Sequence, residues 1–348
     1  MNRGCVVVAI FMEEVNFMHM ADALISPAVG GTLWAAGAAL TGYSVKRTGP
    51  EFHEQKAPLM GVLGAFVFAA QMINFAIPGT GSSGHLGGGL LLAVLLGPYA
   101  GFLTMASILT IQALLFADGG LLALGCNIVN LAFFPCFVAY PLIFRPLAAG
   151  QPSRLRLAVA VTAAVVVGLQ LGALGVVTET LLSGISALPF STFVLFMLPI
   201  HLAIGLVEAA VTTAVLWFVQ REAPDLLTET SVRTPAAAMP LRKIIIGFLV
   251  AALFTGGLLS WFASADPDGL EWAIQKTAGT AELDNSGPLH LLAASWQEKT
   301  SLLPDYQAAW LNFGGNDSTA AAGLIGVGLT LLLAGAVGVG CRALVRRN

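Results

Sequence analysis

Two histidines stand beside apolar segments of this sequence in settings that suit metal binding. His19 follows Met18 in "NFMHMADALISP", and His85 ends the glycine-rich stretch "PGTGSSGH". A histidine at the second position of a chain offers one ion three nitrogens: the terminal amine, the deprotonated amide and ring Nδ1, which close a five- and a six-membered chelate ring. A second imidazole completes a planar set of four nitrogens, which suits Ni(II), Cu(II) and low-spin Co(II). Chance placement of two histidines is the alternative.

This chemistry requires that the working chain begin at Met18. Residues 1–17 make a poor signal peptide, because the apolar part is short, acidic residues follow it and no A-x-A pattern appears. Glu13-Glu14-Val15 can instead be encoded as GAG-GAG-GTG, which contains a ribosome-binding sequence two codons before Met18. We therefore expect 1–17 to be a translated leader. The bulky His19 should keep methionine aminopeptidase from removing Met18. Since the ligands must lose protons, binding should weaken as the pH falls.

The chain around these histidines has the composition of a polytopic membrane protein. Of its 348 residues 57% are hydrophobic and 10% are charged, whereas about a quarter of the residues of soluble domains are charged. The net charge of −3 argues against a nucleic-acid partner. The four cysteines show no CxxC spacing, which argues against a zinc site. The sequence has no G-x-x-x-x-G-K-[ST], so ATP-driven transport would need an ATPase on another subunit.

Apolar runs separated by charged or Gly/Pro-rich segments predict the membrane crossings. The run at 86–116 is too long for one helix, and "GPY" at 97–99 divides it into two. The expected spans lie at about 28–45, 57–77, 86–116 (two), 122–144, 157–182, 190–218, 243–263 and 319–341.

The basic residues orient these spans. Lysines and arginines gather at 46–56, 145–156 and 221–243, and the three groups fall on one side only if 86–116 crosses twice. The predicted fold is therefore an all-α polytopic membrane protein in the bacterial inner membrane, with the N-terminus outside and the C-terminus inside. His19 and His85 then both lie at the outer face.

The apolar runs and the polar segment between them divide the chain into units. A seven-helix bundle covers 18–218, and a polar, proline-containing linker follows at 219–241. A second unit at 242–348 has two transmembrane helices and an outer loop at about 264–318. The linker has the character of a fusion joint.

Several polar residues are candidates for supporting roles. Ser82 and Ser83 precede His85 in the glycine-rich loop and could orient its ring, as outer partners of metal ligands do. Asn74 is interpreted as a polar contact between helices. His201 and Glu208 are seven residues apart on one helix face, where a buried carboxylate indicates function. A hydrogen-bonded lock between helices is an equally good interpretation of this pair.

Small residues predict a close helix contact near the N-terminus. Gly31, Ala35 and Ala39 are spaced four residues apart in the first span, which allows another helix to approach closely. The approaching helix belongs either to this chain or to a partner.

Four segments together resemble the CbiM/NikM family, the substrate-specific membrane components of energy-coupling-factor (ECF) transporters for cobalt and nickel. They are "MHMADALISP", "GSSGHLGGGLLLAVLLGPYAG", "QALLFADGGLLALGCNIVN" and "LPIHLAIGLVEAAVT", and the resemblance covers about 18–220. It implies a metal site made of the Met18 amine, His19 and His85. It also implies a transmembrane coupling (T) subunit and two cytoplasmic ATPases as partners, with Ni2+ or Co2+ as substrate.

The second unit resembles the PDGLE domain through "DPDGLEWA" (266–273) and "LPDY" (303–306). That domain is similar to the small accessory component, NikN or CbiN, of the same transporters, and the fusion favours nickel slightly over cobalt. Asp266, Asp268 and Glu271 either attract cations or cap a turn, and the cap is favoured.

The alternative function is a self-sufficient ion-coupled permease with His201 and Glu208 as its proton relay, but the inverted repeats typical of such carriers are absent from the sequence.

Overall fold

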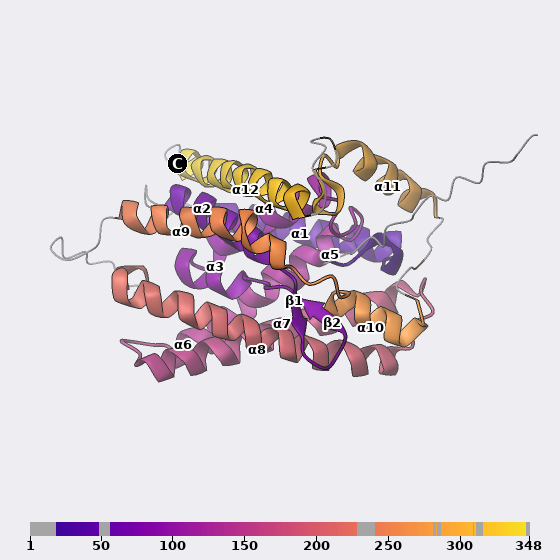
Figure 1. Ribbon diagram of the computed structural model, residues 1–348, viewed down its shortest axis with the longest axis horizontal. Coiled ribbons are helices and arrows are strands. Elements are labelled where there is room, and N and C mark those ends of the chain that lie inside the picture. Colours follow the sequence, from indigo (N-terminus) through magenta and orange to yellow (C-terminus); the bar gives the residue numbers. More distant parts are fainter. Residues whose placement is uncertain are drawn as a thin grey trace, which may run out of the picture.

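The computed structural model describes residues 19–48, 56–227, 241–280, 283, 287–308, 310 and 316–345. Met18, the leader expected at 1–17 and most of the linker lie outside these residues. The helices, in chain order, are α1 (Pro27–Thr48), α2 (Lys56–Gln71), α3 (Gly89–Leu96), α4 (Pro98–Leu115), α5 (Leu124–Ile128), α6 (Arg145–Leu147), α7 (Arg154–Ser183), α8 (Phe190–Glu222), α9 (Leu241–Gly257), α10 (Gly269–Ala278), α11 (Pro288–Thr300) and α12 (Asn316–Val345) (Figure 1).

Shorter elements connect these helices. A π-helical stretch, Val129–Phe144, joins α5 to α6 and contains Pro135 and Pro141, which lack the amide hydrogens of a regular α-helix. Strands β1 (Phe75–Ile77) and β2 (Ser82–Gly84) form an antiparallel hairpin. The sequence predicts the end of a membrane span at the position of β1 and a loop at the position of β2. Single 3₁₀ turns lie at Asp22–Leu24, Pro224–Leu226, Leu259–Phe262 and Pro304–Tyr306.

The break at "GPY" is confirmed. Gly97, with φ of 83°, ends α3, and Pro98 begins α4. A φ in this range costs glycine little, because it has no Cβ. However, α3 has only eight residues and is about 12 Å long, well short of the roughly 30 Å apolar core of a bilayer. The run at 86–116 therefore contains one helix of membrane-spanning length.

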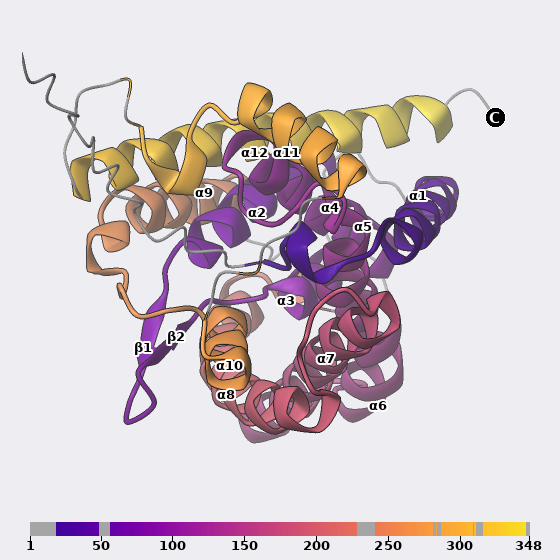
Figure 2. The same ribbon diagram turned by 90° about the vertical axis from the view of Figure 1, so that its right-hand side faces the viewer.

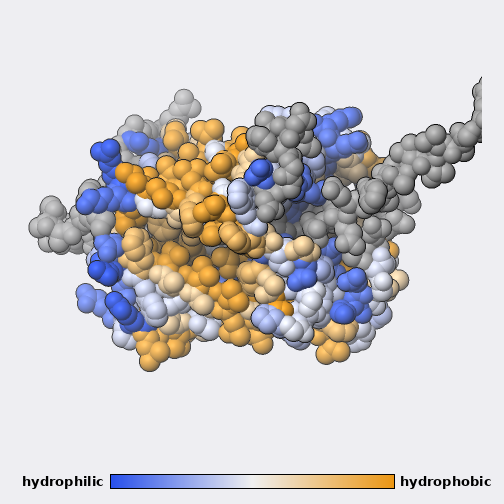
Figure 3. Space-filling view, in the orientation of Figure 1, coloured by the Kyte–Doolittle hydropathy of each residue, from blue (hydrophilic) through white to orange (hydrophobic). Residues whose placement is uncertain are grey.

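Five described helices are long and apolar enough to cross a membrane, which agrees with an all-α polytopic protein. They are Pro98–Leu115, Leu124–Leu147, Arg154–Ser183, Phe190–Glu222 and Asp317–Leu344. The predicted spans 57–77 and 243–263 are shorter than expected, because α2 ends at Gln71 and α9 at Gly257. Helix length and composition thus do not establish nine crossings. An apolar band nevertheless separates two hydrophilic ends of the molecule (Figure 3).

The two predicted units, 18–218 and 242–348, pack closely against each other. Helix α12 lies obliquely over α2 and α9, while α7 and α8 pair on the opposite side (Figures 1 and 2). Glycines permit the α2–α12 contact, since a Cβ on Gly61 would lie 2.8 Å from the carbonyl oxygen of Leu331. Phe68, Phe102 and Phe116 are fully buried in the core between these layers.

The molecule has two different ends. In Figure 1, α6, the end of α8, the start of α9 and the C-terminus lie at one end, and these segments carry many of the basic residues. The β1–β2 hairpin and α10 lie in the other half. On α1, Gly31, Ala35 and Ala39 are exposed, so no helix of the described chain covers this stripe of small residues.

Candidate metal site

The segment that begins at His19 is held by α5 and by the turn between α4 and α5. The Asn127 side chain accepts a hydrogen bond from the backbone N–H of Met20 (3.0 Å) and donates one to its carbonyl oxygen (3.1 Å). The Gly120 N–H also donates to that carbonyl (3.0 Å). A Cβ on Gly119 would lie 2.8 Å from Cβ of His19, so only glycine permits this approach. These contacts fix the backbone on which His19 stands.

The His19 ring contacts a buried acid. Its Nδ1 lies 2.9 Å from Asp118 Oδ2, and both side chains are nearly inaccessible to solvent. Burial alone would raise the pKa of Asp118, but His19 and a hydrogen bond from the Tyr306 hydroxyl (2.6 Å) outweigh it and hold that pKa below its ordinary value. Gln112 Nε2 donates to the Tyr306 oxygen (3.2 Å). Nε2 of His19 is buried without a hydrogen-bond partner among the described residues.

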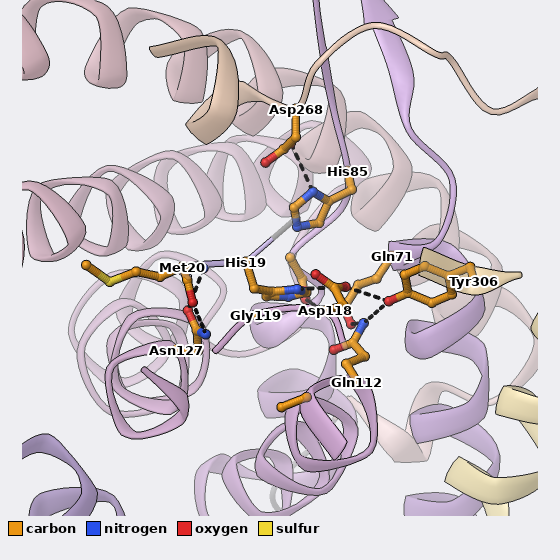
Figure 4. Close-up of polar contacts among 12 residues, drawn as sticks. His19, Met20, Gln71, His85, Gln112, Asp118, Gly119, Asn127, Asp268 and Tyr306 are labelled. Atoms are coloured by element: carbon orange, nitrogen blue, oxygen red, sulfur yellow. Dashed lines mark hydrogen bonds and ion pairs between the residues drawn. The ribbon is translucent and has the colours of Figure 1, made fainter. Parts of the chain in front are cut away.

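Two carboxylates hold His85, one through the backbone of its loop and the other through its ring. The Glu208 carboxylate, on α8, accepts hydrogen bonds from the backbone N–H groups of Gly87 (2.8 Å) and Gly88 (2.9 Å). Nδ1 of His85 lies 3.2 Å from Asp268 Oδ1. Burial by itself lowers the pKa of His85, but the Asp268 carboxylate more than compensates and raises it. Since Nδ1 contacts Asp268, the other ring nitrogen faces the cavity beside His19 (Figure 4).

The two imidazoles meet in one cavity. Their centroids are 5.3 Å apart, and their planes are inclined by 52°. The cavity of about 60 Å³ is also lined by Asp268, His201 and Asn130. Within the described residues, no group of three or more His, Cys, Asp or Glu side chains could hold an ion. An ion between these rings would therefore need further ligands of another kind, such as backbone or terminal nitrogens.

A family model described as the cobalt uptake substrate-specific transmembrane region, CbiM, matches residues 19–226. The chain belongs to the CbiM family. A second model, the PDGLE domain, matches residues 242–343, so the chain joins a CbiM region to a PDGLE region. Both resemblances seen in the sequence are confirmed.

Relatives match most or part of this chain. The chain is 31% identical to the fused nickel transport protein NikMN of Rhodobacter capsulatus, over 95% of this chain and 99% of the relative. It is 29% identical to the cobalt transport protein CbiM of Geobacter sulfurreducens, over 78% and 81%. A crystal structure of a truncated transition metal transporter superposes with a TM-score of 0.51 at 31% identity, covering 59% of this chain and 99% of that one. The chain is thus a member of a membrane transporter family rather than an enzyme family.

The supporting residues behave differently from the sequence predictions. Ser82 and Ser83 do not hydrogen-bond to His85, because their hydroxyls donate to backbone carbonyls, including Pro267 and Asp266 of the PDGLE region. The backbone carbonyl of Asn74 likewise accepts a hydrogen bond from the N–H of Ser264, at 2.7 Å. Ser82, Ser83 and the backbone of Asn74 therefore fasten the hairpin to the PDGLE region, in place of the roles predicted for their side chains.

His201 and Glu208 do not form a pair. Nδ1 of His201 contacts the carbonyl oxygen of Met197 on its own helix (2.8 Å), and its ring lines the cavity. Glu208 is committed to the backbone of the His85 loop. A proton relay between the two would need a contact that this arrangement lacks.

Three residues contact or support the histidines in a way that the sequence did not predict, although Asp268 was already considered as a cation-attracting or capping residue. Asp118 lies in the "ADGGL" turn, Asp268 in "DPDGLEWA" and Tyr306 in "LPDY". All three motifs are visible in the sequence, but their separation of up to 188 positions hides the hydrogen bond between Tyr306 and Asp118. The favoured cap role of Asp268 is also present, since its Oδ2 accepts from the Leu270 N–H at the start of α10.

We expect Glu208→Gln to destabilise the CbiM region. A glutamine side chain has one carbonyl oxygen, so one of the two glycine N–H groups would face an amide NH2 without an acceptor. An unsatisfied buried donor costs about 1–3 kcal/mol, which should lower the unfolding temperature in detergent. Glu222→Gln is the matched control at the solvent-accessible end of α8. Equal melting of the two variants would contradict the assigned role.

Proposed function

We propose that this protein is the metal-binding membrane subunit of an ATP-driven ECF importer for a divalent transition metal, Ni2+ in preference to Co2+. The observation that carries the proposal is the meeting of His19 and His85 in one buried cavity. A relative from Rhodobacter capsulatus that matches 95% of this chain is named a fused nickel transport protein, which supports nickel. Nitrogen ligands in a planar set suit both ions.

The proposed ligands are the Met18 amine, the amide and ring nitrogens of His19, and the His85 ring. They require translation to start at Met18, because a peptide bond to Phe17 would convert the amine into an amide. The family match that begins at residue 19 supports this start. Only Nδ1 of His19 can close a six-membered ring with its own amide nitrogen. Binding would therefore exchange the Asp118 contact at Nδ1 for the ion.

The energy would come from other subunits. The chain has no P-loop, so the proposal includes a T subunit and cytoplasmic ATPases. The CbiM region would cross the inner membrane seven times, with the short α3 counted as one crossing, and the PDGLE region twice. The N-terminus would then lie outside and the C-terminus inside. The basic helix ends at one end of the molecule, opposite the half that contains α10 and the hairpin, support this orientation.

Uptake of radioactive nickel into membrane vesicles tests this function. ATP-dependent uptake should require this chain together with its T subunit and ATPases. An ion-coupled permease would instead accumulate nickel without them and would lose uptake when the proton gradient is collapsed. That second result would contradict the proposal.

The exposed stripe of small residues on α1 is proposed as the contact with the T subunit. We expect Ala35→Leu together with Ala39→Leu to prevent close helix approach and to reduce co-purification of the T subunit at least about tenfold, with Ni2+ affinity unchanged. Leu332→Ala, at an exposed position of α12, serves as a control. Normal co-purification of the double variant would exclude this surface.

A further inference from the structure

The PDGLE region contributes one carboxylate, that of Asp268, to the lining of the metal cavity. Asp268 is buried, its side chain being 3% exposed, and its Oδ1 lies 3.2 Å from Nδ1 of His85. Imidazoles that bind metals commonly donate their second N–H to a carboxylate, which fixes the tautomer and the direction of the ring. The contact leaves Nε2 of His85 directed toward His19 (Figure 4).

Backbone contacts set the register between Asp268 and His85. The N–H of Ser83 donates to the carbonyl oxygen of Pro267 (2.8 Å), and the Ser83 hydroxyl donates to that of Asp266 (2.7 Å). Ser83 and Asp268 also form a parallel bridge. Because His85 follows β2 directly, the segment at 266–268 is aligned with the strand that leads to the ligand.

Side-chain packing holds the same segment over the cavity. The indole N–H of Trp272, on α10, donates to the carbonyl oxygen of Thr80 in the hairpin turn (3.1 Å). A Cβ on Gly269 would lie 2.8 Å from Cδ1 of Ile204, so the chain passes close to α8 at this point. Leu270 lines the cavity together with Asp268. The carboxylate therefore stands on a fixed backbone.

We propose that Asp268 is a positioning residue for metal binding, which aligns His85 from the PDGLE region so that the two regions build one site. This inference rests on the proposed function, because it assumes that His85 binds the ion. It gives the PDGLE region a direct part in the affinity for nickel, beyond its packing against the CbiM region. Asp268 contacts His85, the metal ligand, and would not contact the ion itself.

The test is Ni2+ binding, measured by calorimetry on the full chain beginning at Met18. Loss of a carboxylate behind a metal-bound histidine typically weakens affinity about 10- to 100-fold, and we expect this for Asp268→Ala. Asp268→Asn keeps an N-cap oxygen for α10 and should fall between wild type and alanine. Asp266→Asn, an exposed neighbour, is the matched control and should bind normally. The absorption spectrum of the bound nickel should change in Asp268→Ala and not in the control.

A double-variant cycle separates positioning from a purely structural effect. In a His85→Ala background the three nitrogens of Met18 and His19 still bind nickel weakly, and adding Asp268→Ala should change that affinity less than about twofold, because coupled residues are not additive. An unchanged affinity in Asp268→Ala, or an equal loss in both backgrounds, would overturn the inference while leaving the His85 site intact. A His85→Ala protein that binds like wild type would overturn the site and the inference together.

Discussion

His85→Ala is expected to weaken Ni2+ binding by about 100-fold or more, beyond the 10- to 100-fold that follows loss of an outer partner. The substitution removes the imidazole that faces His19 at a centroid distance of 5.3 Å, and nothing else on β2 or its loop offers a nitrogen side chain at that place. Calorimetry with Ni2+ and Co2+, alone and in competition, measures the loss and the preference between the two ions.

His53→Ala is the control for this experiment. The sequence places His53 between the first two apolar spans, on the side predicted to be cytoplasmic, and it lies outside the described residues. Both variants should purify and melt like the parent. If His85→Ala still binds nickel with parental affinity, the proposed site is wrong.

The second large effect concerns the N-terminus. A chain that retains residues 1–17 should lose at least as much Ni2+ affinity as His85→Ala, because the peptide bond to Phe17 removes the amine and with it the five-membered chelate ring. The ring of His19 and the ring of His85 would remain, so the extended chain should still bind Ni2+ weakly through two imidazoles. N-terminal sequencing of the protein from its native membrane identifies the start that the cell uses.

Proteolytic removal of an N-terminal extension before Met18 provides the matched control within one protein. An extension ending in a factor Xa recognition sequence leaves Met18 as the first residue after cleavage. Binding should be weak before cleavage and should recover afterwards, with an uncleavable extension as the reference. Tight binding that is indifferent to cleavage would show that the amine is not a ligand.

The sequence alone determined the class of protein and the main candidates. Few charges and long apolar runs require a membrane solvent for most of the helices, and the family resemblance was confirmed for both regions. The Gly97 break was predictable because glycine followed by proline ends one helix and begins another. His19 and His85 stood out because each lies beside the end of an apolar run, and the basic residues place both of these ends at the outer face.

Only the tertiary structure decided how these histidines are held. Asp118 lies 99 positions from His19, and Asp268 lies 183 positions from His85, so no local pattern couples them. Ser82 and Ser83 are adjacent to His85 in sequence, yet their strand geometry directs their hydroxyls to the PDGLE segment instead. Local spacing reports which residues share a face, whereas the packing of distant segments decides which partner each buried polar atom finds.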